Sequence, residues 1–474
     1  MVYGYAFWYI LSKITTPDVI GISSSLISLA AIFTSLASIG IPVGTQRFLG
    51  KMFLEGKFED IKLFIKTSLI ITTVGIITCC GALLMGRDWL IGTYHYNLIA
   101  VTIILIASST ISVLLRYVII ASLETKKLLI TSVISSGVKL LLTIILVFIA
   151  DDELGVTIGF TIAPMLSAIL LGINVTSLIK ASQIKSSFKF IETFRILLRA
   201  SVVTWIPSLI DTIGGQIGTI TVLAIQGSSQ AGFYFIAFQI SIGISAVIWA
   251  LESVTFPVLS GMNAQRNLFL WRVIKIGLII VLPLSSSALF YSKDIMQIFG
   301  YNYAEGALPL QILLLSTLPT AIAAGISILM YSYGSYREVL IIGLATSIPR
   351  ILLYFIFIPW YSGTGAALSF TIGSIIGFIV SIIISKRLGK IIFWKDLALI
   401  FFIPILFAFL LSIINTHFVL AIILSIILSY LLLLKLEIVN RNDVQDSLAV
   451  LPSNIANPLS GIVNKIGSKL NKNY

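Results

Sequence analysis

Long runs of apolar residues, separated by short polar or charged segments, follow one another along almost the whole chain. The runs show no strict alternation of apolar and polar positions, which favours helices over the strands of a barrel. About 20 predominantly apolar residues cross a hydrocarbon core of roughly 30 Å, and in lipid every backbone amide needs a partner within its own segment. The pattern therefore predicts an all-α integral membrane protein. We expect fourteen spans, at residues 2–14, 19–43, 63–85, 97–121, 128–150, 154–179, 196–225, 231–258, 273–291, 308–333, 338–360, 363–385, 397–414 and 417–435.

The first run, 2–14, is too short to cross a membrane alone, so we expect its helix to begin further upstream. It has neither a basic n-region nor a small-residue cleavage pattern, and so is not expected to be a signal peptide.

Composition supports this class of protein. Of 474 residues, 58% are hydrophobic and 11% charged, and the mean hydropathy is +1.07. Soluble domains have about 45–50% apolar and about 25% charged residues, so a soluble domain is excluded.

Basic residues are divided unequally between the connections. The connections after even-numbered spans and the C-terminal tail hold 25 Lys and Arg, and the opposite connections hold 3. Because basic residues in short loops mark the cytoplasmic face, both termini are predicted to be cytoplasmic in a multi-pass protein of the plasma membrane. Topology and anionic lipids account for the net charge of +12, without a nucleic acid partner.

Cysteine and histidine suggest no metal or cofactor. Cys79 and Cys80 are adjacent within one apolar run and match no metal-ligand spacing. His95 and His417 lie far apart between apolar runs, where a solvated histidine is expected rather than a catalytic one.

A weak internal repeat has a period near 211 residues. The paired positions are Gly21 with Gly232, Lys126 with Arg337, Leu129 with Leu340, Lys139 with Arg350 and, after a one-residue slip, Gly155, Phe160, Thr161 and Ile162 with Gly365, Phe370, Thr371 and Ile372. Since the period covers six spans, the halves would enter the membrane in the same direction, related by a pseudo-two-fold axis along its normal.

The repeat predicts four regions: an N-terminal lobe at 1–180, a C-terminal lobe at 181–390, two extra helices at 391–437 and a cytoplasmic tail at 438–474. Two six-helix lobes around a central cavity are an arrangement suited to alternating access.

Several short motifs resemble one known family, the flippases of polysaccharide biosynthesis within the multidrug/oligosaccharidyl-lipid/polysaccharide exporter superfamily. They are Gly40-Ile41-Pro42 followed by Arg47-Phe48, Asp211, Ala231-Gly232-Phe233-Tyr234, Phe256-Pro257, Ala307 to Leu314, and Ile358-Pro359-Trp360-Tyr361 leading to Gly363, Gly365, Ala366 and Ala367. The resemblance covers nearly the whole chain. It implies a transporter that moves a lipid-phosphate- or lipid-pyrophosphate-linked oligosaccharide from the cytoplasmic to the external leaflet. An Asn often found eight residues before the Ile-Pro pair is replaced here by Arg350, which bears on the headgroup site.

Three basic residues lie deeper inside spans, more than four residues from either end. Lys139 and Arg350 are near the centres of theirs, where a charge costs about 2.5–3.5 kcal/mol by insertion scales. Their matched repeat positions suggest that both face the cavity and bind the anionic headgroup, with Arg350 able to form a bidentate fork. Arg116 either receives the headgroup first or extends to the interface.

Four further polar residues within the spans have two interpretations each. Asp211 and Glu252 either neutralise the buried bases or bind a coupling ion, H⁺ or Na⁺. Gln216 and Gln239 either hydrogen-bond the sugars of the substrate or join helices to one another.

Proline is expected to bend several spans. Pro207 and Pro349 lie near the charged candidates, so each is either a hinge that couples binding to lobe movement or a static bend.

Two rival functions make different demands on the sequence. An enzyme acting on the same lipid would need acid–base or metal-binding groups in a sizeable loop, and the connections here are short and mostly basic. The alternative function is a cation-coupled multidrug or metabolite antiporter of the same superfamily, in which acidic residues would be expected to dominate the cavity.

Overall fold

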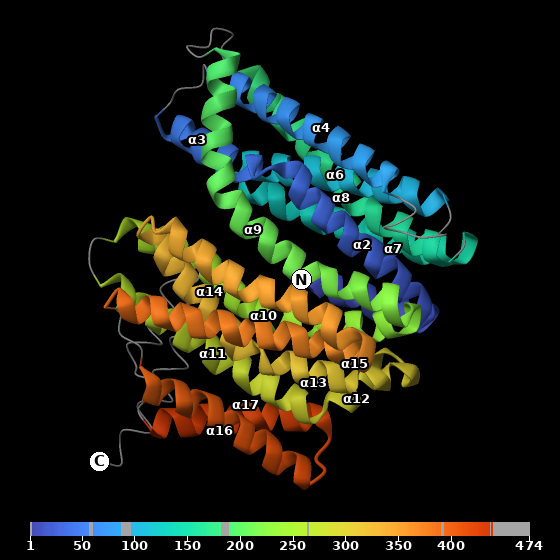
Figure 1. Ribbon diagram of the computed structural model, residues 1–474, viewed down its shortest axis with the longest axis vertical. Coiled ribbons are helices and arrows are strands. Elements are labelled where there is room, and N and C mark those ends of the chain that lie inside the picture. Colours follow the sequence, from blue (N-terminus) through green and yellow to red (C-terminus); the bar gives the residue numbers. More distant parts are fainter. Residues whose placement is uncertain are drawn as a thin grey trace. The chain divides into compact units, whose positions relative to one another are not determined.

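The computed structural model describes residues 2–55, 60–86, 96–150, 152–181, 189–262, 265–389, 393–436 and 438. These residues form helices and connections without a β-strand (Figure 1). The elements are α1 (Val2–Ile14), α2 (Pro17–Ser38), α3 (Ile41–Glu55), α4 (Ile61–Met85), α6 (Tyr96–Ala121), α7 (Thr125–Ile149), α8 (Asp152–Ala181), α9 (Phe190–Gln226), α10 (Ser228–Gly261), α11 (Arg266–Phe290), α12 (Ser292–Phe299), the 3₁₀ helix η1 (Tyr301–Gly306), α13 (Ala307–Leu315), α14 (Thr317–Ser332), α15 (Tyr336–Arg387), α16 (Trp394–Ile413) and α17 (Phe418–Lys435).

Each predicted span overlaps a described helix. Twelve stretches of described helix are long and apolar enough to cross a membrane, which confirms the all-helical membrane class. The sequence pattern missed α3, α12 and η1 because these elements are short and mixed in polarity. The predicted tail at 438–474 lies outside the described residues except for Ile438.

The helix α15 is a helical hairpin rather than one rod. A straight helix of its 52 residues would be about 78 Å long, far more than a bilayer requires. Ser362 interrupts it with φ 51° and ψ −134°, and so separates a first limb from a second. The predicted boundary between spans 338–360 and 363–385 is therefore correct.

The chain forms two compact units. Unit 1 comprises residues 1–235 and 351–366, and unit 2 comprises 236–350 and 367–474. The helices α10 and α15 therefore each contribute residues to both units. This grouping of contacts differs from the predicted division into lobes at 180 and 390, which stays a prediction.

In unit 1, close backbone packing joins the beginnings of α2 and α10. Thr16 caps α2, with Pro17 at the first helical position, where a missing N–H costs nothing. A methyl group added to Gly21 would meet the Ser228 carbonyl, and one added to Gly232 would meet the Pro17 carbonyl. Both Pro17 and Ser228, and Gly21 and Gly232, are 211 residues apart, so the crossing is reciprocal in the way that a two-fold axis predicts.

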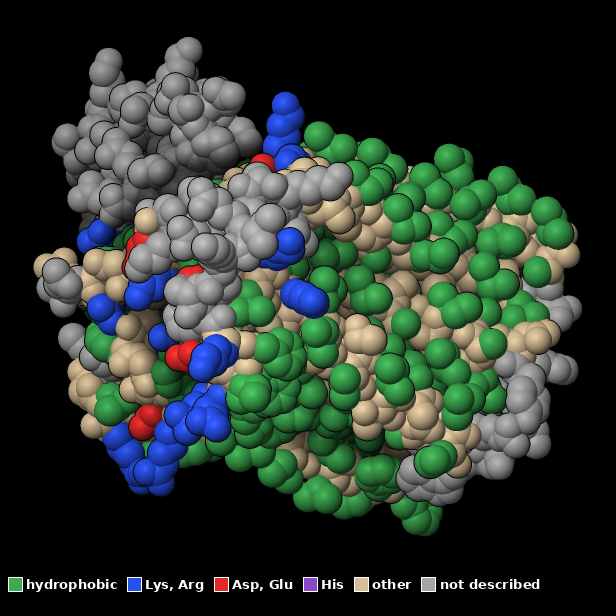
Figure 2. Space-filling model, turned by 90° about the horizontal axis from the view of Figure 1, so that it is seen from above, with side chains coloured by type: hydrophobic (Ala, Val, Ile, Leu, Met, Phe, Trp, Pro, Cys, Tyr) green, Lys and Arg blue, Asp and Glu red, His purple; other side chains and the backbone are tan. Residues whose placement is uncertain are grey.

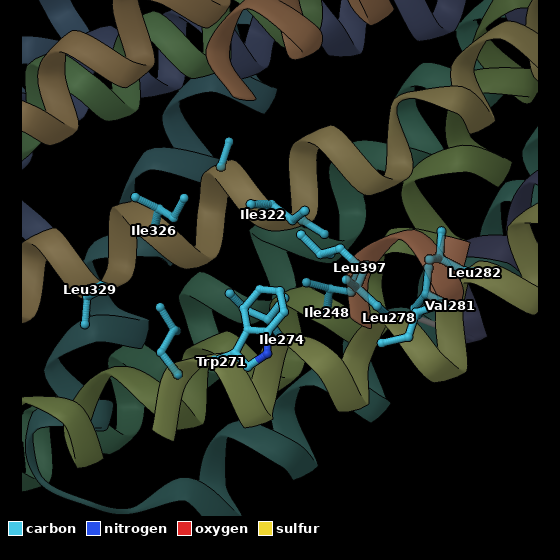
Figure 3. Packing of buried hydrophobic residues seen from close by; sticks show 14 of the residues in the cluster. Ile248, Trp271, Ile274, Leu278, Val281, Leu282, Ile322, Ile326, Leu329 and Leu397 are labelled. Carbon is cyan, nitrogen blue, oxygen red and sulfur yellow. The ribbon is translucent and has the colours of Figure 1, made fainter. Parts of the chain in front are cut away.

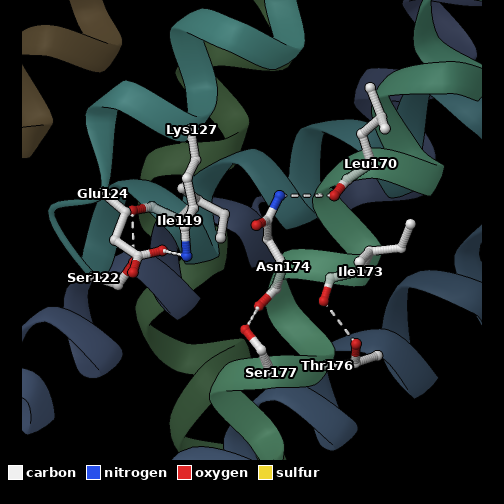
Figure 4. A network of polar contacts seen from close by, with 9 residues as sticks. All are labelled: Ile119, Ser122, Glu124, Lys127, Leu170, Ile173, Asn174, Thr176 and Ser177. Carbon is white, nitrogen blue, oxygen red and sulfur yellow. Dashed lines mark hydrogen bonds and ion pairs between the residues drawn. The ribbon is translucent and has the colours of Figure 1, made fainter.

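Local polar contacts occur at the start of α7 and towards the end of α8. Lys127 pairs at 2.6 Å with Glu124, the residue before α7, and the Asn174 amide of α8 donates to the Leu170 carbonyl (Figure 4). The exposed hydroxyl of Thr176 bonds within its own helix in the same way.

Unit 2 has a continuous apolar core. Side chains of α10, α11, α14 and α16 interlock there, including Ile248, Trp271, Ile322 and Leu397 (Figure 3). The helices α16 and α17 pack on α11, where the Lys275 ammonium lies 3.4 Å from the Asp396 carboxylate.

Apolar and charged side chains are distributed unequally on the surface. On the face shown in Figure 2, the Lys and Arg side chains gather in one region, and many of the side chains drawn outside it are apolar. Large apolar residues such as Phe148, Leu352 and Phe402 are more than half exposed, as expected for side chains that face acyl chains.

Candidate functional site: two buried cations and a hydroxyl-lined cavity

The inner face of α7 is polar. Its buried residues recur every four positions, at Thr131, Ser135, Lys139, Thr143 and Val147, and so lie along one side of the helix. The opposite side is exposed and apolar. A polar face turned towards protein is typical of membrane helices, because small and hydroxylated residues allow close packing there.

The second helix of this hairpin, α8, is shaped to receive that face. The Ser167 hydroxyl donates to the Ser135 hydroxyl at 3.0 Å. Gly159 packs against Thr143 so closely that a methyl group would collide with the threonine side chain. This close approach fixes Lys139 at the helix interface.

Lys139 is 9% exposed and lies against aromatic rings. Its ammonium is 4.2 Å from the ring centroid of Phe7 and 4.7 Å from that of Phe160. None of the described residues forms an ion pair with Lys139 or accepts a hydrogen bond from its ammonium. Attraction to the faces of the two rings, worth up to about 2 kcal/mol when desolvated, offsets part of the cost of burial.

The first limb of α15 repeats this arrangement in a second place. Arg350 is 3% exposed, and its guanidinium carbon lies 3.8 Å from the ring centroid of Phe370 on the second limb. One terminal nitrogen donates to the Ser374 hydroxyl at 3.0 Å. The buried Nε has no hydrogen-bond partner among the described residues.

The two hairpins agree in their close contacts. Gly377 packs on Thr346, and at the matched positions of the first hairpin Ser167 bonds to Ser135. The Arg350 guanidinium stacks on Phe370, and the Lys139 ammonium lies over the matched Phe160. A cation stacked on a phenylalanine of the following helix therefore occurs at both matched positions.

The acidic candidates are not ion-paired with these cations within their own units. Glu252 on α10 is buried at 6% exposure and Asp211 on α9 is exposed. No ion pair joins Glu252 to Arg350 in unit 2, or Asp211 to Lys139 or Arg116 in unit 1. One Glu252 carboxylate oxygen is buried without a hydrogen-bond partner among the described residues, 3.9 Å from the methyl position of Gly325.

The remaining predicted residues lie on α6, α9, α10 and α15. Arg116 on α6 is exposed, and Gln216 on α9 and Gln239 on α10 are partly buried. Pro207 is buried inside α9. Pro349 directly precedes Arg350, after which the chain passes from unit 2 to unit 1.

Unit 1 also contains a cavity of about 390 Å³ between α2, α6, α8 and α9. Its shape follows from the end of α2, where Ile39 and Gly40 take left-handed φ values of 47° and 68° and stop the helix. This leaves the Ser35 carbonyl without its usual partner in the helix, and the Trp205 indole N–H of α9 donates to it at 2.8 Å. Gly40 lies so close to Trp205 that a methyl group would collide with its Cβ.

The described residues of the cavity wall are rich in hydroxyl groups and include no charged residue. Its polar lining residues are Thr34, Ser35, Ser38, Ser109, Tyr117, Thr204, Ser208 and Thr212. The Thr34 hydroxyl is buried, and none of the described residues bonds to it. Phe160 contributes to the lining, whereas Lys139 does not, so the ring of Phe160 belongs to both the cavity and the cation site.

Sequence reasoning missed Trp205, Thr34 and the two phenylalanines as site residues. Phe160 and Phe370 had appeared as partners in the repeat, which was the one available signal for them. Among the described residues no cluster of three His, Cys, Asp or Glu side chains could hold a metal ion.

Comparison with known proteins identifies the family. The family model described as "Polysaccharide biosynthesis protein" matches residues 2–263, more than half of the chain. The chain belongs to this polysaccharide biosynthesis family. It is also 27% identical over 410 residues to the uncharacterized membrane protein MJ1375 of Methanocaldococcus jannaschii, covering 81% of this chain and 94% of that protein.

Solved structures show the fold of this family member. The inward closed conformation of the lipid II flippase MurJ matches with a TM-score of 0.62 at 16% identity, covering 90% of this chain and 97% of that one. An inward-facing multidrug resistance MATE family transporter of the MOP superfamily matches with a TM-score of 0.66 at 16% identity, covering 81% and 93%. The predicted membership of a polysaccharide biosynthesis family is confirmed by the family model, and the chain shares the fold of both solved proteins.

Proposed function

We propose that this protein is a flippase, which moves lipid-phosphate- or lipid-pyrophosphate-linked oligosaccharide from the cytoplasmic to the external leaflet by alternating access. The observation that supports it best is the pair of buried cations, Lys139 and Arg350, neither with a carboxylate partner among the described residues of its own unit. Both are stacked on phenylalanine at matched positions of two hairpins.

A phosphate group would supply both cations with a negative charge and with hydrogen-bond acceptors. A guanidinium has five N–H donors, and at Arg350 one bond to Ser374 is described while Nε stays unpaired. An arriving phosphate can accept two parallel N–H bonds from this side chain, and such charge-assisted bonds are about twice as strong as neutral ones. The lysine ammonium is a compact charge that can likewise bind a phosphate oxygen.

The repeat and the topology belong to the same proposal. The reciprocal glycine crossing and the matched hairpins support two lobes of six helices related along the membrane normal. The excess of basic residues on one set of connections supports cytoplasmic termini in a plasma membrane protein. In this arrangement Pro207 and Pro349 act as hinges, and Arg116, which is exposed, meets the headgroup first.

The buried carboxylate of Glu252 supports coupling to a cation gradient. An unpaired carboxylate inside a membrane protein is costly unless it is protonated or holds a cation. We therefore infer that Glu252 takes up the coupling ion, H⁺ or Na⁺. The same residue is the observation that favours the alternative function, a cation-coupled multidrug or metabolite antiporter.

Transport in proteoliposomes tests the flippase proposal directly. Purified variants are reconstituted with a fluorescent lipid-linked oligosaccharide, and the protein-dependent transfer between leaflets is measured. Lys139→Ala and Arg350→Ala should each slow transfer roughly tenfold or more, since each removes charge-assisted bonds. The double variant should be inactive, and the charge-conserving exchange of Lys139→Arg with Arg350→Lys should retain part of the rate.

Arg337→Ala is the matched control, because this arginine is exposed at the start of α15. It should transport at the rate of the unmodified protein. Full activity of the double alanine variant would eliminate the proposal.

A further inference from the structure

We propose that the cavity of unit 1 is a binding site for a neutral saccharide ring, separate from the cationic site that binds the phosphate. The inference rests on the proposed function, because it assigns the sugar part of the same substrate. It identifies a second binding region, between α2, α6, α8 and α9, that uses no charge.

The lining excludes charged ligands on chemical grounds. An anion needs cationic side chains or free N–H donors, and the Trp205 indole N–H is already bonded to the Ser35 carbonyl. A cation needs carboxylates, and the lining contains none. A cationic ligand would also lie over Phe160, whose ring is 4.7 Å from the Lys139 ammonium.

The same lining fits a polyhydroxylated ring. The hydroxyls of Ser38, Thr204 and Thr212 donate to carbonyls of their own helices and can still accept a hydrogen bond from a sugar hydroxyl. Trp205 and Tyr117 supply aromatic surface for the apolar C–H face of a sugar ring, and Ile27, Ala31 and Val113 supply further apolar surface. The wall thus alternates hydroxyl and apolar groups, as the surface of a sugar ring does.

The size of the cavity limits its occupant. The volume of about 390 Å³ is near the lower end of the range for small-molecule sites, roughly 300–1,000 Å³, so we expect one or two sugar rings.

The position of Phe160 explains how the two sites would cooperate. One part of its side chain lines the cavity, and its ring receives the Lys139 ammonium. A saccharide seated in the cavity would lie across this ring from the cation. A phosphate attached to the sugar could then reach Lys139 without the sugar itself contacting a charge.

Protection of an introduced cysteine tests the site by binding alone. Thr212→Cys is made in the full chain with Cys79→Ser and Cys80→Ser, and labelling by a small maleimide is followed in a detergent without a sugar headgroup. Maltose and N,N′-diacetylchitobiose are the probes, and tetraphenylphosphonium and pyrophosphate are the charged comparisons. At four times its Kd a disaccharide should slow labelling about fivefold.

Two further variants make the result decisive. Thr176→Cys, exposed on α8 and outside the lining, should label at the same rate with and without sugar. Ser109→Cys, a second lining position on α6, should be protected like Thr212→Cys and replaces it if that variant does not fold. Protection by neither disaccharide, or by a charged probe alone, overturns the proposal.

The two proposals fail separately. If the unmodified protein does not move lipid-linked oligosaccharide while the disaccharides still protect Thr212→Cys, the flippase proposal is wrong and the saccharide site remains. If transport occurs without protection, the saccharide site is wrong and the flippase proposal remains.

Discussion

Arg350→Met removes the buried guanidinium of α15 and keeps an unbranched side chain of comparable length. In the empty protein, the arginine costs about 2.5–3.5 kcal/mol to place at mid-membrane. Its stacking on Phe370 stabilises the folded protein by about 2 kcal/mol, and its bond to Ser374 by about 1.5–3 kcal/mol. These contributions nearly cancel, so the free energy of unfolding should change by no more than about 1–2 kcal/mol.

Transport should respond very differently to the same substitution. Each charge-assisted bond to a phosphate is worth about 1.5–3 kcal/mol, so the loss of one slows transport roughly 10- to 150-fold if the bond forms in the rate-limiting state. The loss of a bidentate pair slows it further. A binding role therefore predicts a large fall in rate with a nearly unchanged melting temperature.

Both quantities are measured on one preparation. Transfer of lipid-linked oligosaccharide is followed in proteoliposomes, and thermal unfolding is followed in detergent. Arg350→Lys keeps the charge without the fork, so its rate should fall between those of Arg350→Met and the unmodified protein. A large fall in melting temperature with transport retained would refute the reasoning, because it would assign Arg350 a structural role.

Two other substitutions test the packing and the ion site. Gly232→Ala should lower the melting temperature, at a cost of about 1–3 kcal/mol, since the new methyl group meets the Pro17 carbonyl; Gly215→Ala, which has open space around it, is the control and should not. Glu252→Gln should remove the dependence of transport on an imposed proton or sodium gradient, and Glu338→Gln should keep it. Unchanged gradient dependence in Glu252→Gln would exclude this residue as the coupling site.

The apolar pattern predicted the helices well because length and hydropathy alone decide whether a segment can cross a bilayer. It also separated the limbs of α15, since Pro359 and Gly363 flank the break at Ser362. The short helix α3 and the 3₁₀ helix η1 could not be predicted in this way, because tertiary packing rather than composition stabilises segments of their length.

For the candidate site, the sequence identified the residues but not their surroundings. Lys139 and Arg350 are unusual at mid-span, and that alone marked them. Their phenylalanine partners come from other helices, and only the packing of the hairpins shows the contact. The cavity depends on the left-handed turn at Ile39 and Gly40, which no hydropathy pattern indicates.

The composition of unit 1 has a consequence for the order in which the protein is made. This unit includes residues 351–366, in which the Tyr354 phenol donates to the Gly214 carbonyl, and Gln226 donates to the carbonyls of Ile358 and Pro359. Translation supplies these residues last among those of unit 1, after residues 236–350 of unit 2. The packing surface of the N-terminal helices therefore stays incomplete until the ribosome has passed Ala366. A chain truncated before that point would lack a segment that packs against its own first half.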